Sequence, residues 1–262
     1  MPPRIHVDTP LNAGMLLALP PNAARHVQVL RLQPGAPLTL FDGHAGEWSA
    51  EVVEMGRKTV TAHLISHRPI ERELATPVTL ALGMPANERM DGLVEKATEL
   101  GVAALQPLVC ERSVLRLAGE RAERKAAHWQ AIAVAACEQS GRNRVPPVGP
   151  AMTFRDWLAM QAVEPTPTPT PTPTTRLVLS LDADARGLID TLAGVRAGVL
   201  AGARAGGPVL VLSGPEGGLS PAEEAAARAA GFLPVNLGAR VLRADTAPLA
   251  LLAIVAALEN LA

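Results

Sequence analysis

The chain has 262 residues, 48% of them hydrophobic and 19% charged, and its formal net charge is −1. This composition is typical of a globular protein with one large or two smaller domains, and so small a charge neither indicates nor excludes a nucleic-acid partner. Two cysteines at unrelated spacing argue against a disulfide framework and a zinc site. The N-terminus lacks a secretion signal, and the most apolar run, Ala247–Leu258, is too short to cross a bilayer. We therefore expect a soluble, cytoplasmic protein with no membrane partner.

The N-terminal part of the sequence is typical of a small β structure. Residues 36–43 and 47–56 flank a short turn, as in a hairpin, and residues 59–68 alternate like a third strand. A short helix is expected over Asn22–Leu32, with Asn22 as its cap and Pro34-Gly35 as its stop. Because an isolated hairpin is only marginally stable, we expect these elements to close into a compact barrel.

Further along the chain, short apolar strands alternate with helices. The expected strands are 77–84, 103–109, 176–181, 208–214 and 232–237, and the expected helices are 87–100, 120–142 and 247–262. This alternation predicts a parallel sheet covered by helices on both faces. The change of pattern places a domain boundary near residues 70–76, so we expect one domain over 1–73 and a second over 74–262.

One tract has low complexity. Residues 164–175 are mainly alternating Thr and Pro and have no apolar face to bury. Proline favours an extended, polyproline-like path. We interpret the tract as a stiff, solvated surface insertion in the second domain, in preference to a ligand for a proline-recognition module.

The segment GPEGGLSPAEE joins an apolar strand to a helix through a glycine-rich turn. Ser220, Pro221 and Glu223 match a capping box with proline at the first helical position, so the helix start is tightly specified. Glycine just before such a helix permits a positive φ or the close approach of a ligand. The glycines in question are Gly214, Gly217 and Gly218.

The charge of this glycine loop argues against a bound phosphate. The loop contains no lysine and carries Glu216 at its centre, and its spacing matches neither common phosphate-binding pattern. A cationic nucleoside such as S-adenosylmethionine is a better partner. The alternative is a tight strand-to-helix turn with a solvated Glu216, and the loop alone does not decide between them.

A second segment, VNLGARVLRADTAPLA, has a similar layout. A strand ends at Leu237-Gly238, a basic stretch carries Arg240 and Arg243, and an apolar helix follows. Open α/β sheets bind ligands where such loops meet at neighbouring strand ends. Arg240 and Arg243 are therefore candidates for contact with an RNA phosphate or a uracil oxygen, the alternative being ordinary surface charges.

Several motifs span nearly the whole chain. They are RHVQVLRLQPGAPLTLFDG, NERMDGLVEKATELGVAALQPLVCERSV, HWQAIAVAACEQSGRNRVPPV, GPEGGLSPAEE and LGARVLRADTA. In this order they resemble the RsmE family of small-subunit ribosomal RNA uridine-N3 methyltransferases. The chain departs from the family at Asp245, where glutamate is more usual, and in its Thr-Pro tract.

The resemblance implies a SPOUT-type α/β domain with a C-terminal trefoil knot, which general topological rules would not predict. It also implies a PUA-like β-barrel over 1–73 that helps to bind RNA, S-adenosylmethionine as cofactor, a homodimer, and 16S ribosomal RNA or the small ribosomal subunit as partner. Two other functions stay open. One is a non-catalytic RNA-binding or ribosome-assembly protein; the other is a nucleotide-binding enzyme, against which Glu216 and the missing lysine count.

The resemblance also assigns site residues. The expected cofactor contacts are Leu181, Gly214, Glu216, Gly217, Gly218, Leu237, Gly238 and Leu242. The expected catalytic residues are Arg243, Arg240 and Glu216, the arginines stabilising negative charge on uracil. The candidates for RNA contact are Arg4, Arg112, Arg142 and Arg144, with structural ion pairs as the alternative.

The general base stays undecided between Glu216 and Asp245, which have loop support and helix capping as their structural alternatives. No metal site is expected, since the shared strand face of His63 and His67 is more typical of a solvated edge. Aromatic residues make up only 2% of the chain, with no tyrosine. RNA binding should therefore depend on arginine, backbone groups and shape rather than on base stacking, and should weaken with salt.

Overall fold

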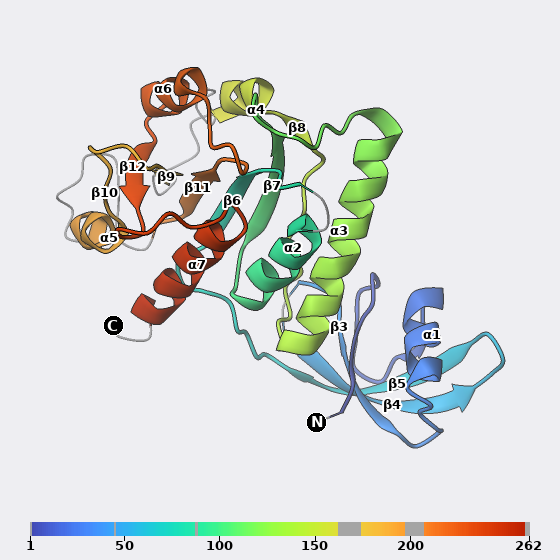
Figure 1. Cartoon of the computed structure of the whole chain (residues 1–262). Coiled ribbons are helices and arrows are strands. Elements are labelled where there is room, and N and C mark those ends of the chain that lie inside the picture. The colour runs from blue at the N-terminus through green and yellow to red at the C-terminus, as the bar shows by residue number, and fades with distance from the viewer. Residues whose placement is uncertain (1, 45, 87–88, 162–173, 197–206, 260–262) are drawn as a thin grey trace. The chain divides into compact units, whose positions relative to one another are not determined.

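The computed structural model describes residues 2–44, 46–86, 89–161, 174–196 and 207–259. The chain divides into two compact units. The first combines residues 1–73 with 134–145, and the second combines residues 74–133 with 146–262. Each unit is built on a sheet of its own (Figure 1).

The first unit contains a five-stranded sheet in the order β1-β3-β4-β5-β2. Its strands are β1 (Arg4–His6), β2 (Leu16–Ala18), β3 (Pro37–Phe41), β4 (Glu47–Met55) and β5 (Val60–Arg68). The predicted hairpin and the third strand are confirmed, because β3, β4 and β5 are antiparallel neighbours. The sequence analysis missed β1 and β2, since three residues are too few to show a period.

Helix α1 (Pro21–Val29) begins and ends earlier than its sequence suggested. Pro20 is its N-cap and no side chain caps it, so the prediction of Asn22 as the cap is wrong. Proline in the first turn fixes the backbone there instead. The helix ends at the C-cap Leu30, followed by Arg31 with a φ of 54°, ahead of the expected Pro34-Gly35 stop.

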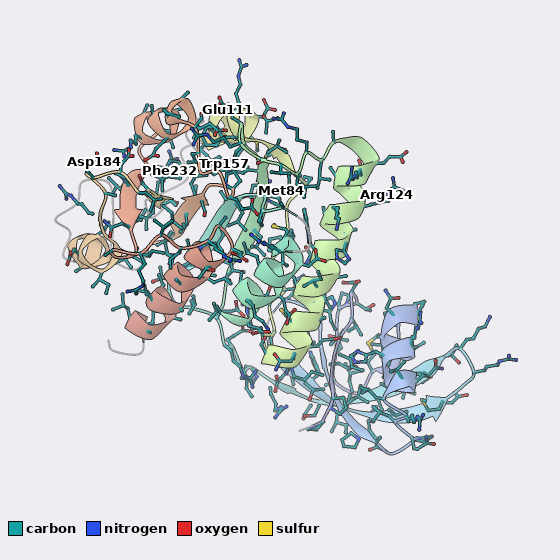
Figure 2. The ribbon with its side chains drawn as sticks, in the orientation of Figure 1. Met84, Glu111, Arg124, Trp157, Asp184 and Phe232 are labelled. Atoms are coloured by element: carbon teal, nitrogen blue, oxygen red, sulfur yellow. The ribbon has the colours of Figure 1, made fainter. Side chains whose placement is uncertain are left out.

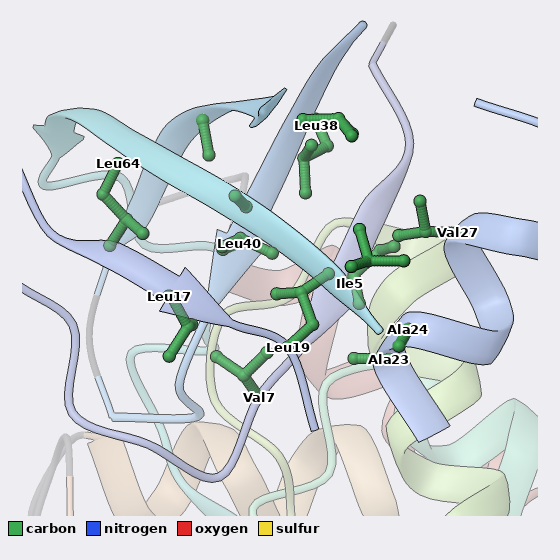
Figure 3. Close-up of a cluster of buried hydrophobic side chains, with 14 of the residues drawn as sticks. Ile5, Val7, Leu17, Leu19, Ala23, Ala24, Val27, Leu38, Leu40 and Leu64 are labelled. Atoms are coloured by element: carbon green, nitrogen blue, oxygen red, sulfur yellow. The ribbon is translucent and has the colours of Figure 1, made fainter. Parts of the chain in front are cut away.

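One hydrophobic core fills the first unit, where α1 packs on the inner face of the strands (Figure 3). The helix contributes small side chains, which allow it to lie close to the sheet. Fully burying a leucine contributes about 2 kcal/mol relative to leaving it exposed. The buried residues include Ile5, Leu17, Leu38, Leu40 and Leu64 from the strands and Ala23, Ala24 and Val27 from α1.

A buried carboxylate links three arginines in the first unit. Glu47, at the start of β4, is 2% exposed and pairs with Arg4, with Arg68 (Nη2 to Oε1, 2.6 Å) and with Arg72 (Nη1 to Oε2, 3.3 Å). Burial raises the pKa of Glu47, but the hydrogen bonds and charges of the arginines outweigh it and lower the pKa below its usual 4.5. Glu47 is therefore held as a carboxylate.

Residues 134–145 join the first unit through polar contacts. Arg4 donates to the carbonyl oxygen of Arg142 (3.0 Å) and to Oδ1 of Asn143 (2.6 Å). Arg142 is 3% exposed and is paired with Glu73. These contacts connect residues far apart in the sequence, which is why the sequence pattern did not indicate them.

The second unit contains a seven-stranded sheet in the order β10-β12-β9-β11-β6-β7-β8. All of its strand pairs among the described residues are parallel, as predicted. The strands are β6 (Val78–Gly83), β7 (Ala104–Val109), β8 (Met152–Thr153), β9 (Thr175–Leu179), β10 (Arg186–Gly187), β11 (Val209–Ser213) and β12 (Leu233–Asn236). Every residue of β11 is buried, as expected of a central parallel strand.

Helices cover this sheet on both faces. They are α2 (Arg89–Glu99), α4 (Phe154–Gln161), α5 (Leu188–Arg196), α6 (Pro221–Ala229) and α7 (Thr246–Glu259). Helix α3 (Gly119–Ser140) begins in the second unit, and its residues 134–140 belong to the first. α4 and α6 pack on one face, where the rings of Trp157 and Phe232 lie 5.7 Å apart (Figure 2). α2 and α7 pack against each other on the opposite face (Figure 1).

The structure shifts one boundary of the expected Thr-Pro insertion. Thr175, the last residue of the expected tract 164–175, already belongs to β9 and is 3% exposed. The rest of the tract, apart from Thr174, lies outside the described residues. The strand starts there because its apolar continuation can be buried in the sheet.

Both cysteines are buried free thiols, Cys110 just after β7 and Cys137 in α3. Burial raises the pKa of Cys110 to about 12 and that of Cys137 to about 11. Because only the thiolate is a good nucleophile, neither cysteine is reactive at neutral pH. Across the described ranges, no helix is both long and apolar enough to span a membrane.

Candidate functional site

A cavity of about 700 Å³ opens at the carboxyl ends of three neighbouring strands of the second unit. β9 ends at Leu179, β11 at Ser213 and β12 at Asn236. The order β12-β9-β11 places the loops that follow these strands side by side. Open parallel sheets bind their ligands at this edge, and the volume is that of a small-molecule site.

The cavity brings together all eight residues expected to contact a cofactor. They are Leu181 after β9, Gly214, Glu216, Gly217 and Gly218 after β11, and Leu237, Gly238 and Leu242 after β12. Arg240 and Arg243 line the same cavity, and Arg112 reaches it from the loop after β7. No group of three or more His, Cys, Asp or Glu side chains in the described part of the chain could hold a metal ion.

The glycines of the site serve two purposes. Gly218 and Gly238 have φ values of +70° and +102°, and no neighbouring atom lies within 4 Å of the place a Cβ would occupy. Gly214 and Gly217 instead permit contacts within the protein. A Cβ on Gly214 would lie 2.7 Å from the nitrogen of Leu219. Gly214 and Gly217 therefore allow the glycine loop to pack closely, whereas Gly218 and Gly238 leave open space at the cavity.

Glu216 ties the glycine loop to the segment that follows β6. Its Oε1 accepts a hydrogen bond from the nitrogen of Ala86 (2.9 Å) and pairs with Nη1 of Arg89 (3.4 Å). The close approach needs Gly83, where a Cβ would lie 2.5 Å from Cδ of Pro215. Of the two alternatives for Glu216, these contacts favour loop support over a general base.

The predicted capping box at the start of α6 is confirmed. The nitrogen of Glu223 donates to Oγ of Ser220 (3.1 Å), and the nitrogen of Ser220 donates to Oε2 of Glu223 (2.9 Å). The second oxygen of Glu223 accepts from the nitrogen of Glu111 (2.9 Å), in the loop after β7. The cap therefore also fixes a neighbouring loop.

Arg112 lies in that same loop, is exposed, and donates hydrogen bonds to the backbone of the glycine loop. Its Nη1 donates to the carbonyl oxygens of Gly217 (2.9 Å) and Leu219 (3.2 Å). Its stem lies along Gly217, where a Cβ would come 3.1 Å from the Cβ of Arg112. Arg112 therefore contacts the glycine loop, and its predicted contact with RNA stays a prediction.

A network of acids forms the β9 side of the cavity. Arg228 pairs with Asp182 (2.8 Å), Asp184 (2.6 Å) and Glu224 (2.9 Å), and Oγ of Ser180 donates to Oε1 of Glu224 (2.6 Å). Asp182, Ser180 and Glu224 all line the cavity. Three carboxylates share one guanidinium, so this wall is electronegative and suits a cationic ligand.

Arg240 and Arg243 differ from the other arginines predicted for the site. Both side chains are exposed, and neither guanidinium has a hydrogen-bond or ion-pair partner in the described ranges. By contrast, Arg4 and Arg142 are engaged in the buried pairs of the first unit. Their burial argues against the predicted RNA contact. Arg144 is half exposed and pairs with Glu71 (3.1 Å).

Asp245 lies directly before α7. Its Oδ1 is buried and has no hydrogen-bond partner within the described ranges, and no hydrogen bond to the first turn of α7 supports the predicted cap. A buried, unpartnered carboxylate oxygen costs free energy. This oxygen is therefore available to a group from outside the described residues.

Sequence reasoning missed Gly83, Arg89 and Arg228. Gly83 and Arg89 act on the loop through contacts across the sheet edge, which no local pattern reveals. Arg228 carried a usable signal, because it follows Glu224 by four residues in a helix and such pairs face each other.

The second unit is a parallel α/β sheet with its cavity at the carboxyl strand ends, the place where such sheets bind nucleotide-like ligands, and the first unit is a separate β sheet. Residues 72–256 match the family described as RNA methyltransferase domain, and residues 19–65 match the family described as RNA methyltransferase PUA domain. The chain belongs to the RNA methyltransferase family whose curated members are called ribosomal RNA small subunit methyltransferase E.

Individual relatives agree with this assignment. The Synechocystis ribosomal RNA small subunit methyltransferase E is 36% identical over 88% of this chain and 69% of the relative, and that of Mycobacterium bovis is 32% identical over 92% and 86%. A crystal structure of the Neisseria gonorrhoeae methyltransferase E bound to S-adenosyl methionine superposes with a TM-score of 0.84, at 36% identity and covering 98% of both chains. A Legionella pneumophila methyltransferase with bound SAM gives 0.85, at 31% identity and again 98% of both chains.

Proposed function

We propose that this protein transfers a methyl group from S-adenosylmethionine to N3 of a uridine in the 16S ribosomal RNA of the small subunit. The observation that carries the proposal is the meeting of three strand-end loops, with all eight expected cofactor residues, at one cavity. The choice of a uridine and of its N3 atom rests on the family resemblance.

The residues of the cavity fit this cofactor. Gly218 and Gly238 leave open space where any other residue would carry a Cβ, while Leu179, Leu237 and Leu242 offer apolar surface to an adenine ring. The acidic β9 wall suits a positive charge. When bound, S-adenosylmethionine supplies an electrophilic methyl group.

The unpartnered arginines would act on the RNA. Removing the N3 proton of uracil leaves negative charge on the ring oxygens, and Arg240 or Arg243 can stabilise it at the cavity where both lie. Their remaining donors can bind phosphate. For the base we choose Asp245, because its Oδ1 has no partner within the described ranges, whereas Glu216 uses its Oε1 to hold the loop.

A homodimer is also part of the proposal. α7 is apolar from Ala247 to Leu258, yet only Pro248, Leu251, Leu252 and Val255 are among its buried residues. Leu181 and Val241, on the cavity wall, are 74% and 75% exposed. A second copy of the chain would cover this apolar surface, as the resemblance implies. The resemblance likewise implies the trefoil knot in the C-terminal segment.

Methylation of ribosomal RNA from a strain that lacks this activity tests the proposal. The wild-type protein with S-adenosylmethionine should add one methyl group to a uridine of 16S RNA, located by mass spectrometry of nuclease fragments. Arg243→Ala should bind S-adenosylhomocysteine normally in calorimetry but lose on the order of 100-fold in kcat, the loss typical of removing one charge-stabilising donor.

Two results would contradict the proposal. RNA binding without any methylation, by a protein that does not bind S-adenosylhomocysteine, would identify a ribosome-assembly protein instead. Binding of ATP in place of the methyl cofactor would favour a nucleotide-binding enzyme. Sedimentation analysis of the same preparations should report a dimer.

A further inference from the structure

The glycine loop is held by hydrogen bonds at two of its peptide units. In the unit between Gly217 and Gly218, the carbonyl oxygen accepts from Arg112 (2.9 Å) and the N–H donates to the carbonyl oxygen of Pro215 (2.8 Å). In the unit between Leu219 and Ser220, the carbonyl oxygen again accepts from Arg112 (3.2 Å) and the N–H donates to Glu223 (2.9 Å). Each of these units is therefore fixed at both ends.

The peptide unit between them differs. The carbonyl oxygen of Gly218 and the N–H of Leu219 have no hydrogen-bond partner in the described ranges, and both residues line the cavity. Gly218 is also exposed and holds a φ of +70°. One guanidinium thus fixes the two flanking carbonyls and leaves the polar groups of this central peptide for a ligand.

From this geometry we infer that Arg112 is a positioning residue for the cofactor and not a contact for RNA. Its guanidinium presets the glycine loop, so that the Gly218–Leu219 peptide is ordered before the ligand arrives. Ordering a loop in advance removes an entropic cost from binding. The inference rests on the proposed function, because it takes the ligand to be S-adenosylmethionine.

The contacts of Arg112 hold the glycine loop in one conformation without a ligand. Its stem fills the place where a Cβ on Gly217 would lie, 3.1 Å from its own Cβ. Glu223, 6% exposed, supports the arrangement by holding Ser220 with one oxygen and the nitrogen of Glu111 with the other. The loop after β7 is therefore joined to the glycine loop and its helix cap at Glu111 as well as at Arg112.

Calorimetry with S-adenosylhomocysteine on the full-length protein tests this role. Arg112→Ala should raise the Kd by roughly tenfold, the equivalent of about 1.4 kcal/mol, while the Kd for the RNA without cofactor stays unchanged. Arg112→Lys keeps the positive charge, but its side chain is one atom shorter, so it should keep RNA affinity and lose most of the cofactor affinity. In turnover, the KM for the methyl donor should rise while the KM for RNA does not.

Arg116→Ala is the matched control. Arg116 lies in the same loop and also donates to a carbonyl oxygen, that of Glu111 (3.3 Å), but it does not contact the glycine loop. It should leave the Kd for S-adenosylhomocysteine at the wild-type value. An equal loss in both alanine variants would show that the loop as a whole is perturbed and would overturn the positioning role.

Two further outcomes separate this inference from the proposed function. If wild type binds S-adenosylhomocysteine but Arg112→Ala weakens only RNA binding, with a salt slope reduced by about one, Arg112 is an RNA contact and the inference is wrong. If the wild-type protein does not bind S-adenosylhomocysteine, both the proposed function and this inference are wrong. Should the alanine variant not fold, the lysine variant gives the same comparison.

Discussion

Gly218 combines a backbone conformation that other residues rarely adopt with open space at the cavity. Gly218→Ala should destabilise the fold by about 1 kcal/mol through its positive φ and weaken S-adenosylhomocysteine binding, because the new methyl group enters the ligand space. Gly231→Ala is the matched control, since Gly231 has a φ of +85°, also has nothing within 4 Å of a Cβ, and follows the other end of α6. The Tm should fall by the same amount in both variants, whereas calorimetry should show weaker binding of S-adenosylhomocysteine in Gly218→Ala alone. Equal cofactor binding by the two variants would show that Gly218 only shapes the turn.

Asp245 presents the opposite situation, a polar atom with no partner. Asp245→Asn keeps the shape but removes the charge, so we expect an unchanged or higher Tm, since an unpaired buried carboxylate is unfavourable. The kcat of methylation should fall sharply while S-adenosylhomocysteine affinity holds. A lower Tm, corresponding to a loss of about 1 kcal/mol in the free energy of unfolding, together with a normal kcat would instead identify a helix cap.

At the scale of elements, the three arginines around Glu47 join β1, β4, the end of β5 and the chain that follows β5. The folded pKa of Glu47 is lowered from 4.5, so its contribution to stability is complete above that value and is lost as the pH falls through the folded pKa. The protection of amides in β1 and β4 against hydrogen exchange, relative to the intrinsic rate at each pH, should therefore fall below about pH 4.5.

Glu47→Gln provides the comparison for that experiment. It should cost about 3 kcal/mol at neutral pH, because it leaves the guanidinium of Arg4, whose side chain is only 10% exposed, without its anion. The protection of its amides in β1 and β4 should then depend far less on pH than that of the wild type. The same acid sensitivity in both proteins would assign the effect to another carboxylate.

Elements whose signal is local could be predicted from the sequence, and elements defined by distant contacts could not. The capping box of Ser220 and Glu223 was predictable because cap, proline and glutamate stand at fixed spacing. β1, with three residues, exists only because it pairs with β3. The helix start at Pro21 was missed because asparagine is a preferred N-cap residue, so the sequence favoured Asn22 over the residue that actually precedes the helix, Pro20.

The arginines of the predicted site show the same division. Sequence placed Arg112, Arg142, Arg240 and Arg243 in suggestive motifs, but a motif does not say whether a guanidinium is already paired. The fold separates them: Arg142 is buried against Glu73, Arg112 holds the glycine loop, and only the other two lack partners among the described residues. Pairing is decided by tertiary contacts, so it had to come from the structure.

At the scale of the whole molecule, the Thr-Pro tract is the clearest candidate for removal. Replacing residues 165–174 by a short Gly-Ser linker should leave methylation and Tm essentially unchanged, because loop length has a weak effect on stability. The carbonyl oxygen of Gln161, before the tract, accepts from Nη2 of Arg176 (2.8 Å) in β9, so the flanking elements hold their own positions. A large drop in activity would show that the tract takes part in RNA binding.

The two buried thiols have a practical consequence for studying motion. Cys110 and Cys137 are the only cysteines in the chain, and burial keeps both protonated at neutral pH. A fluorophore or spin label carrying a maleimide would therefore not react with the two native cysteines, and would react with a single cysteine introduced on the surface. Met160, 61% exposed and outside the cofactor cavity, is one such position. Distance measurements across the working enzyme then need no cysteine-free background.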